Sequence, residues 1–452
     1  MKTPRALALL GACLLSVMGA LSGCVNAPLS APVVSERAIA FVDVNVVPMD
    51  SERVLTEQTV IVRNGLIAAL GPTATITVPP DAERIDGRGR FLMPGLADFQ
   101  IHLHSDEQLL SYLAHGVTTV FDLNGAPRQL DLRTQLAEYR RFGPRLYTSG
   151  PMMDGGQGRG DAVSVTTAEQ ARIAVVRQKL AGYDALKVYH TVSPGVYEVL
   201  MGMARQQKLP VVGHVPRTVG AEAVLRARQA LVAPGSEFFA TTLRDEPAMA
   251  ALARATKEAG TSVVPGLVQI HAQLRMLEDV EGVFADPEAR YLSPEVLRNW
   301  SYSNPTRRID VAAFGARERA LYPAMRAFTL ALQKEGARLV VGTDASDAGL
   351  FPGRSVHREL VELVEAGLTP FEALSAATRN AGAFIQQHVD PAARFGTVAV
   401  GQYADLLLLP GNPLEDVGRA AQALGVMSRG QWLPGEQLQR MRDKSAKALP
   451  GR

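Results

Sequence analysis

The chain has 452 residues, of which 47% are hydrophobic, and its formal net charge is only +2. This length exceeds a single barrel of ~250 residues and leaves material for a second domain. The small charge, without basic runs interleaved with aromatic residues, argues against a nucleic-acid partner.

The first 23 residues are predicted to be a signal peptide. Lys2 and Arg5 precede an apolar stretch, Ala6–Ala20, that is too short to span a bilayer. Leu21-Ser22-Gly23-Cys24 follows, which predicts a lipoprotein cut before Cys24. The alternative is an ordinary signal peptide with a chance cysteine. A lipid on Cys24 would anchor the chain to a membrane of the cell envelope, at the periplasmic face or the cell surface.

The chain has one other cysteine, Cys13, which lies in the segment predicted to be removed. The mature chain would therefore have no thiol pair for a disulfide and no thiolate zinc site. Residues 24–36 contain prolines and polar residues, and we expect them to be a tether. No later apolar stretch is long enough to span a membrane.

Residues 37–93 are predicted to form a small antiparallel sheet. Val42, Val44 and Val46 alternate with polar residues, which is the period of a strand. Asn64-Gly65 separates two apolar runs and predicts a two-residue hairpin turn. Strand-like texture returns in residues 393–440, so we expect a small β-sandwich built from both chain ends. A polar tail, residues 441–452, is expected to follow.

Residues 94–392 alternate short apolar runs with helical patterns. This alternation predicts a parallel α/β architecture, and over ~300 residues a (β/α)8 barrel is the natural candidate. Thr166–Glu169 and Thr369–Glu372 fit the capping-box pattern at helix starts. The predicted buried strands are Val117–Val120, Ala185–Val188, Pro210–His214, Ser262–Leu267 and Arg338–Gly342.

The first barrel strand carries Gln100, His102 and His104 near its end. Alternate residues of a strand face the same side, so these three side chains would point together into the barrel mouth. Two imidazoles at this spacing make a metal pair. The alternative is that one histidine binds metal while the other packs or caps.

Three further apolar runs end in a polar residue, namely Lys187, His214 and Asp344. A buried lysine must find a partner or lose its charge, so Lys187 is either salt-bridged or carboxylated into an anionic metal ligand. A polar residue at one strand end is common and says little. However, the ends of parallel barrel strands share one face, where catalytic residues collect. These three strand ends and the strand end that carries His102 together therefore indicate one site.

These features make the chain resemble the amidohydrolase superfamily, in its imidazolonepropionase-like and prolidase-like branch. The resemblance covers nearly the whole mature chain. Its motifs are Pro94-Gly95-Leu96-Ala97-Asp98, Gly116-Val117-Thr118-Thr119, Leu186-Lys187-Val188-Tyr189, Gly342-Thr343-Asp344-Ala345, Ala376-Ala377-Thr378-Arg379-Asn380 and Gly401-Gln402-Tyr403-Ala404-Asp405-Leu406.

The resemblance implies a distorted eight-stranded barrel beside a small β-sandwich. It also implies one or two divalent metal ions, with zinc expected, that serve the hydrolysis of amide, ester or related bonds. In this pattern a carboxylated Lys187 bridges the metals and His214 binds the second one. His102 falls on the first metal's histidine pair, and Asp344 would bind that metal and act as general base.

Two positions depart from the family pattern. Gln100 stands where the first histidine of the strand-one pair is expected, and Pro234 stands where a sixth-strand histidine is expected. Three outcomes are open. The strand could shift so that His102 and His104 form the pair, with Glu237 helping elsewhere; a single, weaker metal could bind; or the site could be kept for binding alone. Among residues beside the site, Tyr189 and His190 are secondary candidates.

The expected function is a metal-dependent hydrolase of C–N bonds in small molecules, acting on a dipeptide or an acylated amino compound. The alternative is a pseudoenzyme with a degenerate site, acting as an envelope ligand-binding lipoprotein. Lys187 and the missing sixth-strand histidine disfavour a mononuclear deaminase. Substrate specificity is expected in loops after the strands, such as Met152–Arg159 and Ala348–Arg354.

Overall fold

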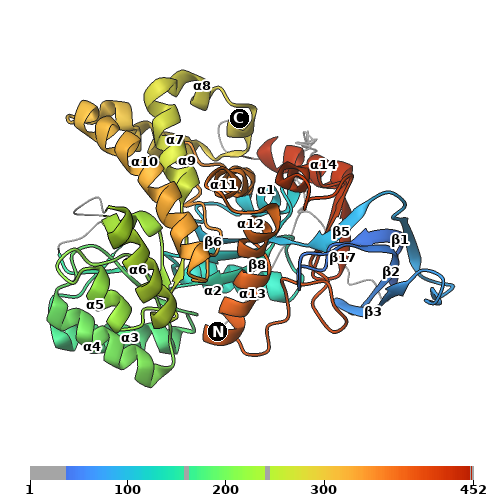
Figure 1. Ribbon diagram of the computed structural model, residues 1–452, viewed down its shortest axis with the longest axis horizontal. Coiled ribbons are helices and arrows are strands. Elements are labelled where there is room, and N and C mark those ends of the chain that lie inside the picture. The colour runs from blue at the N-terminus through green and yellow to red at the C-terminus, as the bar shows by residue number, and fades with distance from the viewer. Residues whose placement is uncertain (1–36, 157–161, 240–244, 448, 450–452) are drawn as a thin grey trace, which may run out of the picture. The chain divides into compact units, whose positions relative to one another are not determined.

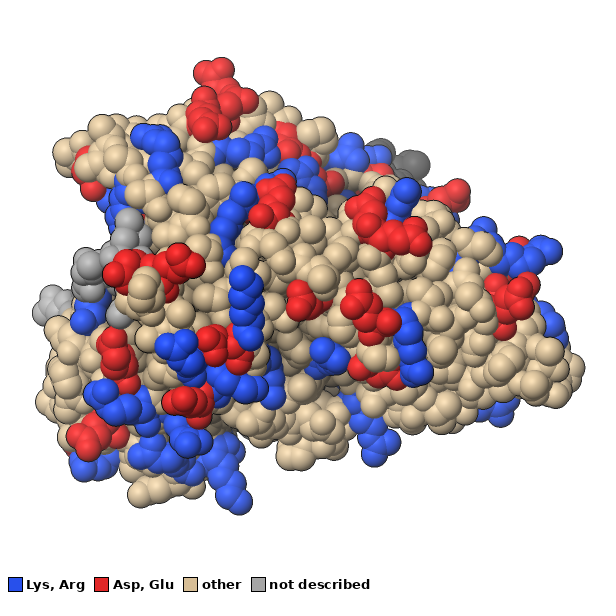
Figure 2. Space-filling view, viewed as in Figure 1, with Lys and Arg blue, Asp and Glu red and all other residues tan. Residues whose placement is uncertain are grey.

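The computed structural model describes residues 37–156, 162–239, 245–447 and 449. The predicted signal peptide, the predicted lipidation site Cys24 and the predicted tether all lie outside these residues. Within the described part, no helix is both long and apolar enough to cross a membrane. Figure 2 shows acidic and basic side chains interspersed over the viewed face, as the small net charge of the sequence leads one to expect.

One mixed sheet combines strands from both ends of the chain (Figure 1). Its order is β17-β16-β15-β5-β1-β2-β3, with β4 beside β1. β15 is the only strand of the C-terminal group that pairs directly with β5 among the described strands, in an antiparallel register that sets Leu407 opposite Met93. The strands are β1 (Ile39–Val46), β2 (Leu55–Arg63), β3 (Leu66–Pro72), β4 (Glu83–Asp86), β5 (Phe91–Pro94), β15 (Leu406–Leu409), β16 (Gly425–Ser428) and β17 (Gln431–Pro434).

The predicted hairpin turn at Asn64-Gly65 is confirmed. Arg63 pairs with Leu66 across the turn. Both turn residues have positive φ, 54° for Asn64 and 75° for Gly65, which is the backbone that a two-residue hairpin requires. The sheet buries an apolar cluster in which Phe41 packs edge-to-face against Trp432, with ring centroids 5.2 Å apart.

The middle of the chain forms two parallel sheets. β6 (Leu96–Ile101), β7 (Val117–Asp122) and β8 (Arg145–Thr148) make one sheet. The second has the order β10-β9-β11-β12-β13-β14. Its strands are β9 (Met153–Asp154), β10 (Val163–Ser164), β11 (Leu186–Val188), β12 (Val211–Gly213), β13 (Leu231–Val232) and β14 (Ser262–Val263).

The edges of these two sheets are linked by isolated bridges and not by continuous strand pairing. Ser149 bridges Ala185, Val263 bridges Leu339, and Ile101 bridges Ala345, all in parallel orientation. The amide of Phe99 also donates to the carbonyl of Val341 at 2.8 Å. The segment predicted as the strand Arg338–Gly342 therefore lies beside both β14 and β6, although it makes only a single-residue bridge to β14.

Helices surround the parallel strands (Figure 1). The capping box Thr369–Glu372 is confirmed at the start of α12, with Pro370 at the first helical position. At α3 the box lies one residue later than predicted, because Gln170 and not Glu169 accepts the amides of Thr166 and Thr167. The longer helices are α2 (Pro127–Ala137), α3 (Ala168–Ala181), α4 (Pro194–Gln207), α6 (Glu246–Ala259), α7 (Leu267–Glu278), α9 (Pro294–Ser303), α10 (Val311–Lys334), α11 (Arg354–Glu365), α13 (Arg379–His388) and α14 (Gly435–Lys447). The shorter ones are α1 (Gln108–Ala114), α5 (Ala221–Arg226), α8 (Val280–Phe284) and α12 (Pro370–Ala376), with 3-10 turns η1 (Gly235–Phe239), η2 (Pro287–Tyr291), η3 (Pro305–Arg307) and η4 (Val417–Gln422).

The predicted strand Ser262–Leu267 ends early. β14 stops at Val263, and Gly266, with a left-handed φ of 67°, turns the chain into α7. The carboxylate of buried Glu359 accepts the backbone amides of Gly266, Leu267 and Val268, so it satisfies the first turn of this helix. A distant side chain thus overrides the strand-like local sequence.

The segment 441–452, predicted as a polar tail, begins inside α14. Met441 and Arg442 are buried, and the Arg442 guanidinium is ion-paired with Glu288 of η2. The polar residues of this segment cover one side of an amphipathic helix, which is why composition alone suggested a tail.

Candidate active site

The first part of the site is an ion pair between His102 and Asp344. β6 ends at Ile101, and the next residue, His102, reaches Asp344 with 3.0 Å between Nε2 and Oδ1. Backbone contacts fix both partners, because the Asp344 amide donates to the Gln100 carbonyl at 2.7 Å and the His102 amide donates to the Ala345 carbonyl at 2.6 Å. Asp344 adopts a left-handed φ of 63°, so its side chain leaves the strand direction.

Buried Asp98 supports this pair from below. Its carboxylate accepts the Thr343 amide at 2.9 Å and the Thr343 hydroxyl at 2.6 Å. Burial raises the pKa of Asp98 to about 7 against the opposing effect of these hydrogen bonds. Asp98, from the Pro94–Asp98 motif, therefore holds Thr343 in place. Thr343 precedes Asp344 in the chain, so Asp98 helps to position Asp344 through its neighbour.

Charge is balanced within the pair. Burial and the Lys187 charge favour the neutral imidazole, yet the hydrogen bond and charge of Asp344 raise the pKa of His102 above its ordinary value. Burial likewise opposes ionisation of Asp344, while His102 and Lys187 hold the pKa of Asp344 below its ordinary value. Lys187 thus acts electrostatically on both members.

Lys187 lies in β11 and is only 1% exposed. Gly213, on the neighbouring strand β12, leaves room for it, since a Cβ at this position would come within 2.9 Å of Lys187 Cγ and 2.6 Å of the Val188 carbonyl oxygen. The Lys187 ammonium stands 6.0 Å from the centroid of the Tyr189 ring. The predicted buried lysine is therefore present, beside the ion pair.

The second part of the site is a cluster formed by His190, His214 and Glu237. His214 Nδ1 lies 2.7 Å from His190 Nε2, and Glu237 Oε1 lies 3.1 Å from His190 Nε2 and 3.5 Å from His214 Nδ1. The three side chains are 10–22% exposed. Each offers one ligand atom, and all three atoms lie within 4.8 Å of one another. The Tyr189 ring packs on both imidazoles, at centroid distances of 4.1 and 4.4 Å.

The donor atoms of this cluster suit a divalent metal ion. Two imidazole nitrogens and a carboxylate oxygen are ordinary zinc ligands. The other carboxylate oxygen of Glu237, Oε2, is buried and has no hydrogen-bond partner among the described residues. A buried, unpartnered carboxylate oxygen is costly, so a cation is the natural partner of this group.

The structure separates His104 from the other two predicted strand-one residues. Gln100 is buried, and its side chain helps to hold the pKa of Asp344 below its ordinary value. His104 lies beyond the end of β6 and is exposed. The expected alternation of Gln100, His102 and His104 therefore ends with the strand, and only His102 of the two histidines meets Asp344.

His190 and Glu237 were secondary candidates by sequence. His190 follows β11 in a loop, and Glu237 lies in the 3-10 turn η1, three residues after Pro234. Neither segment has a period that assigns a facing direction. Only their positions in the chain pointed to them. His190 comes shortly after Lys187, and Glu237 comes shortly after Pro234, where the family pattern has a histidine.

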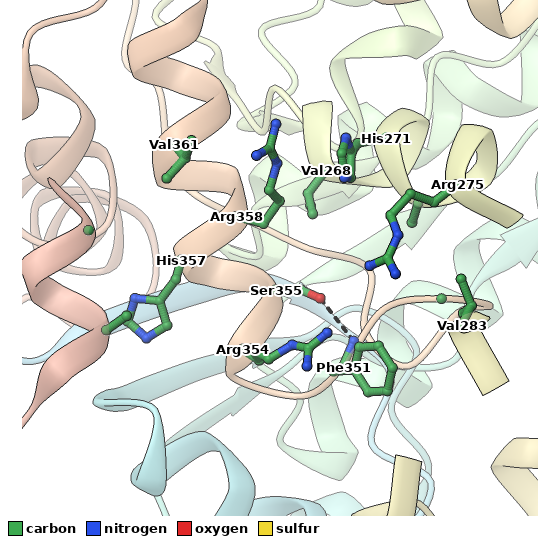
Figure 3. A pocket seen from close by; sticks show the side chains of 14 residues that line it. Val268, His271, Arg275, Val283, Phe351, Arg354, Ser355, His357, Arg358 and Val361 are labelled. Carbon is green, nitrogen blue, oxygen red and sulfur yellow. Dashed lines mark hydrogen bonds between the residues drawn. The ribbon is translucent and has the colours of Figure 1, made fainter. Parts of the chain in front are cut away.

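A separate cavity of about 340 Å³ lies between α7 and α11 (Figure 3). Arg354 in its wall is paired with Asp286 at 2.7 and 2.6 Å, and Arg358 is hydrogen-bonded to Glu362. His271 and His357 also line this cavity, and none of the predicted metal ligands does. This cavity is therefore distinct from the two groups at the strand ends.

Comparison with known proteins gives the family context. Residues 91–433 match the model of a family described as the amidohydrolase family. A bottromycin amidohydrolase of known structure is 26% identical with a TM-score of 0.73, and the match covers 92% of this chain and 91% of that one. A candidate prolidase from Bifidobacterium longum is 25% identical with a TM-score of 0.70, covering 92% and 100%.

Curated relatives match over short segments. An adenine deaminase from Ruegeria sp. (strain TM1040) is 35% identical over 80 residues, which is 17% of this chain and 13% of that protein. An adenine deaminase from Rubrobacter xylanophilus is 32% identical over 114 residues, or 22% of this chain and 19% of that protein. The chain thus matches less than a fifth of the length of either deaminase.

Proposed function

Because the chain belongs to the amidohydrolase family, we propose that it is a metal-dependent hydrolase of C–N bonds in small molecules. The observation that carries the proposal is the pairing of His102 with Asp344 beside buried Lys187. The similarity to a bottromycin amidohydrolase and to a candidate prolidase supports a substrate with an amide bond, such as a dipeptide or an acylated amino compound.

We further propose that the parallel strands close into a distorted eight-stranded barrel. The three isolated bridges at the sheet edges support this, since they link β8 to β11, β14 to the segment around Leu339, and that segment's continuation to β6. Closure would bring all the strand ends to one face. The sheet from both chain ends, β1–β5 with β15–β17, would form the small β-sandwich beside the barrel.

In the proposed roles, His102 and Asp344 would hold one metal, and His214 would hold part of a second position. Lys187 would react as a free amine with carbon dioxide, lose one proton and become an anionic group that could serve as a further ligand. When bound, a divalent metal such as zinc supplies Lewis acidity and lowers the pKa of a bound water toward ~7.

Asp344 is the proposed general base. Its carboxylate points toward His102 at the strand ends and has an oxygen free of hydrogen bonds within the described residues, which could accept a proton. It would take the proton of the attacking water and pass it to the leaving nitrogen. His102 Nε2 lies 3.0 Å from Asp344 Oδ1, so the two side chains face the same point, where they could hold the metal together.

Metal analysis coupled to a substrate panel tests the proposal. The purified full chain should carry about one or more metal equivalents, as a site of this ligand type would. It should hydrolyse members of a panel of dipeptides and acyl-amino acids, lose activity with a chelator and regain it with zinc. A chain that takes up no metal and turns over no panel member would instead support the ligand-binding pseudoenzyme.

We also propose that the protein is a lipoprotein of the cell envelope, anchored through Cys24. The support is the Leu21–Cys24 pattern, which follows a short apolar segment. Cys24→Ala should release the protein from the membrane fraction or block its maturation. Unchanged membrane association of this variant would remove the proposal.

A further inference from the structure

We propose that this chain has relocated a metal-binding position, with His190 and Glu237 joining His214 in place of the histidine that Pro234 replaces. This inference rests on the proposed hydrolase function and names ligands for one of its metal positions. The ligand would be a divalent ion that accepts nitrogen and oxygen donors, such as zinc, cobalt or manganese.

The distances match a shared ion. Ligand atoms ~2.1 Å from a tetrahedral zinc are separated from one another by roughly 3.4 Å. The three separations in the cluster are 2.7, 3.1 and 3.5 Å. A small widening of the His190–His214 contact would bring all three atoms to coordination distance.

Hydrogen bonding alone does not satisfy the cluster. His190 Nε2 contacts both His214 Nδ1 and Glu237 Oε1. If Nε2 carries a proton, that single proton must be shared between two acceptors. If it carries a lone pair, the lone pair faces the Glu237 carboxylate. A cation placed among the three atoms satisfies their lone pairs together.

The surrounding backbone holds the two new ligands in place. Next to His190, the Thr191 amide and hydroxyl donate to Asp154 of β9 at 2.8 and 2.6 Å. The Arg217 amide donates to the His190 carbonyl at 2.9 Å. Glu237 lies in the short turn η1, whose Phe238 and Phe239 are buried against Phe328. These contacts fix ligand positions that come from a loop and a 3-10 turn.

The departure at Pro234 is consistent with this relocation. Pro234 cannot ligate a metal through its side chain. It packs against the turn at Gly266, since a Cβ added to Gly266 would lie 3.1 Å from the Cβ of Pro234. The chain therefore has no ligand at position 234, but it provides a carboxylate three residues later that faces His214.

Metal binding by variants of the full chain tests the inference. We would compare Glu237→Gln and His190→Gln with the wild type and with two control variants, Glu198→Gln and His271→Gln, which lie outside the cluster. The readouts are metal equivalents by elemental analysis, zinc affinity by competition with a chelator, and the visible spectrum of the cobalt-loaded protein.

Both cluster variants should weaken zinc binding at one position by at least about tenfold, as loss of a ligand or its partner does. The cobalt spectrum should change, while the controls match the wild type. Glu237→His should retain the metal, because it returns an imidazole to the cluster. Thermal unfolding of each variant checks that the protein remains folded.

The outcomes separate this inference from the proposed function. A wild type that binds metal, together with cluster variants whose zinc affinity and cobalt spectrum are unchanged, would overturn the relocation and leave the hydrolase proposal standing. A wild type that takes up no metal would overturn both. If Glu237→Gln fails to fold, Glu237→Asp replaces it, and an unchanged affinity in that folded variant and in His190→Gln would equally overturn the relocation.

Discussion

The His102–Asp344 pair and the His190–His214–Glu237 cluster both bring candidate metal ligands together, but different parts of the fold hold them in place. The pair is held by backbone hydrogen bonds between strand ends, and its opposite charges neutralise each other. The cluster is assembled from a loop, a strand end and a 3-10 turn. Each half contains a buried carboxylate oxygen without a hydrogen-bond partner among the described residues, Oδ1 of Asp344 in the pair and Oε2 of Glu237 in the cluster. The pair places one imidazole nitrogen beside a carboxylate, whereas the cluster brings three ligand atoms within 4.8 Å of one another.

The largest expected effect is on the pair. Asp344→Asn keeps the size of the side chain and removes its ability to accept a proton. We expect kcat on the best panel substrate to fall by ~10²–10⁴-fold, the usual contribution of a general base. Steady-state kinetics would measure it, with Asp81→Asn, an exposed aspartate, as the matched control. A variant that keeps most of its kcat would assign the base elsewhere.

Lys187 acts on the pair through its charge and lies 6.0 Å from the Tyr189 ring, which packs on the two imidazoles of the cluster, so its substitution should affect both halves. Lys187→Ala should reduce metal affinity by more than the ~10–100-fold that follows loss of an outer partner of a metal ligand. Lys187→Glu should retain part of the metal, because glutamate supplies an anionic group. Elemental analysis of both variants makes the comparison. Equal metal content in wild type, alanine and glutamate variants would remove Lys187 from the site.

The hydrogen bonds that position the two halves should contribute differently to the free energy of unfolding. Thr343→Val removes a hydroxyl donor from buried Asp98, which should lower the free energy of unfolding by about 1–3 kcal/mol. Thr191→Val removes a donor from Asp154 at an exposed residue, where the loss should be about 1 kcal/mol or less. Urea unfolding measures both. Equal losses would mean that the loop half is as rigidly built as the strand-end half.

The smallest effect uses a histidine outside both halves. Burial lowers the pKa of His357 to about 3, and its ring nitrogen Nε2 lies 2.8 Å from the His115 carbonyl oxygen. Above pH 6.5 the ring is neutral in both states. Below pH 6.5, His357 binds a proton in the unfolded chain but stays neutral in the folded protein, so the free energy of unfolding falls as the pH decreases toward 3.

From pH 6.5 to 5.5 this group should cost about 1 kcal/mol of the free energy of unfolding. His357→Gln keeps a donor for the His115 carbonyl and cannot titrate, so its stability should fall less over this interval. Denaturant unfolding at several pH values measures the difference. Parallel pH profiles for wild type and variant would show that His357 does not titrate as described.

The sequence predicted those parts of the molecule that follow a period or a turn rule. The Asn64-Gly65 hairpin and the Thr369–Glu372 capping box depend on neighbouring residues alone, and both are confirmed. The contact of His102 with Asp344 joins two predicted strand ends. Such features are encoded locally, or by the common direction of parallel strands.

The features that were missed depend on distant contacts. α7 begins where Glu359, from another helix, accepts the amides of a turn that looked like strand. No periodicity predicted which way His190 and Glu237 face, because a loop and a 3-10 turn have no fixed period. His104 lies past the end of β6, where strand alternation no longer applies.

The sheet shared by both chain ends sets an order in which the protein can be completed. β5 is made early, but the strand that covers its free edge, β15, comes from the last part of the chain. Asp405, just before β15, also supplies the carboxylate that pairs with Arg145 of β8. Until β15 has been synthesised, one edge of β5 presents unpaired backbone groups and is a template for pairing with another molecule. This architecture therefore requires that the open edge of β5 be protected while the nascent chain still lacks β15.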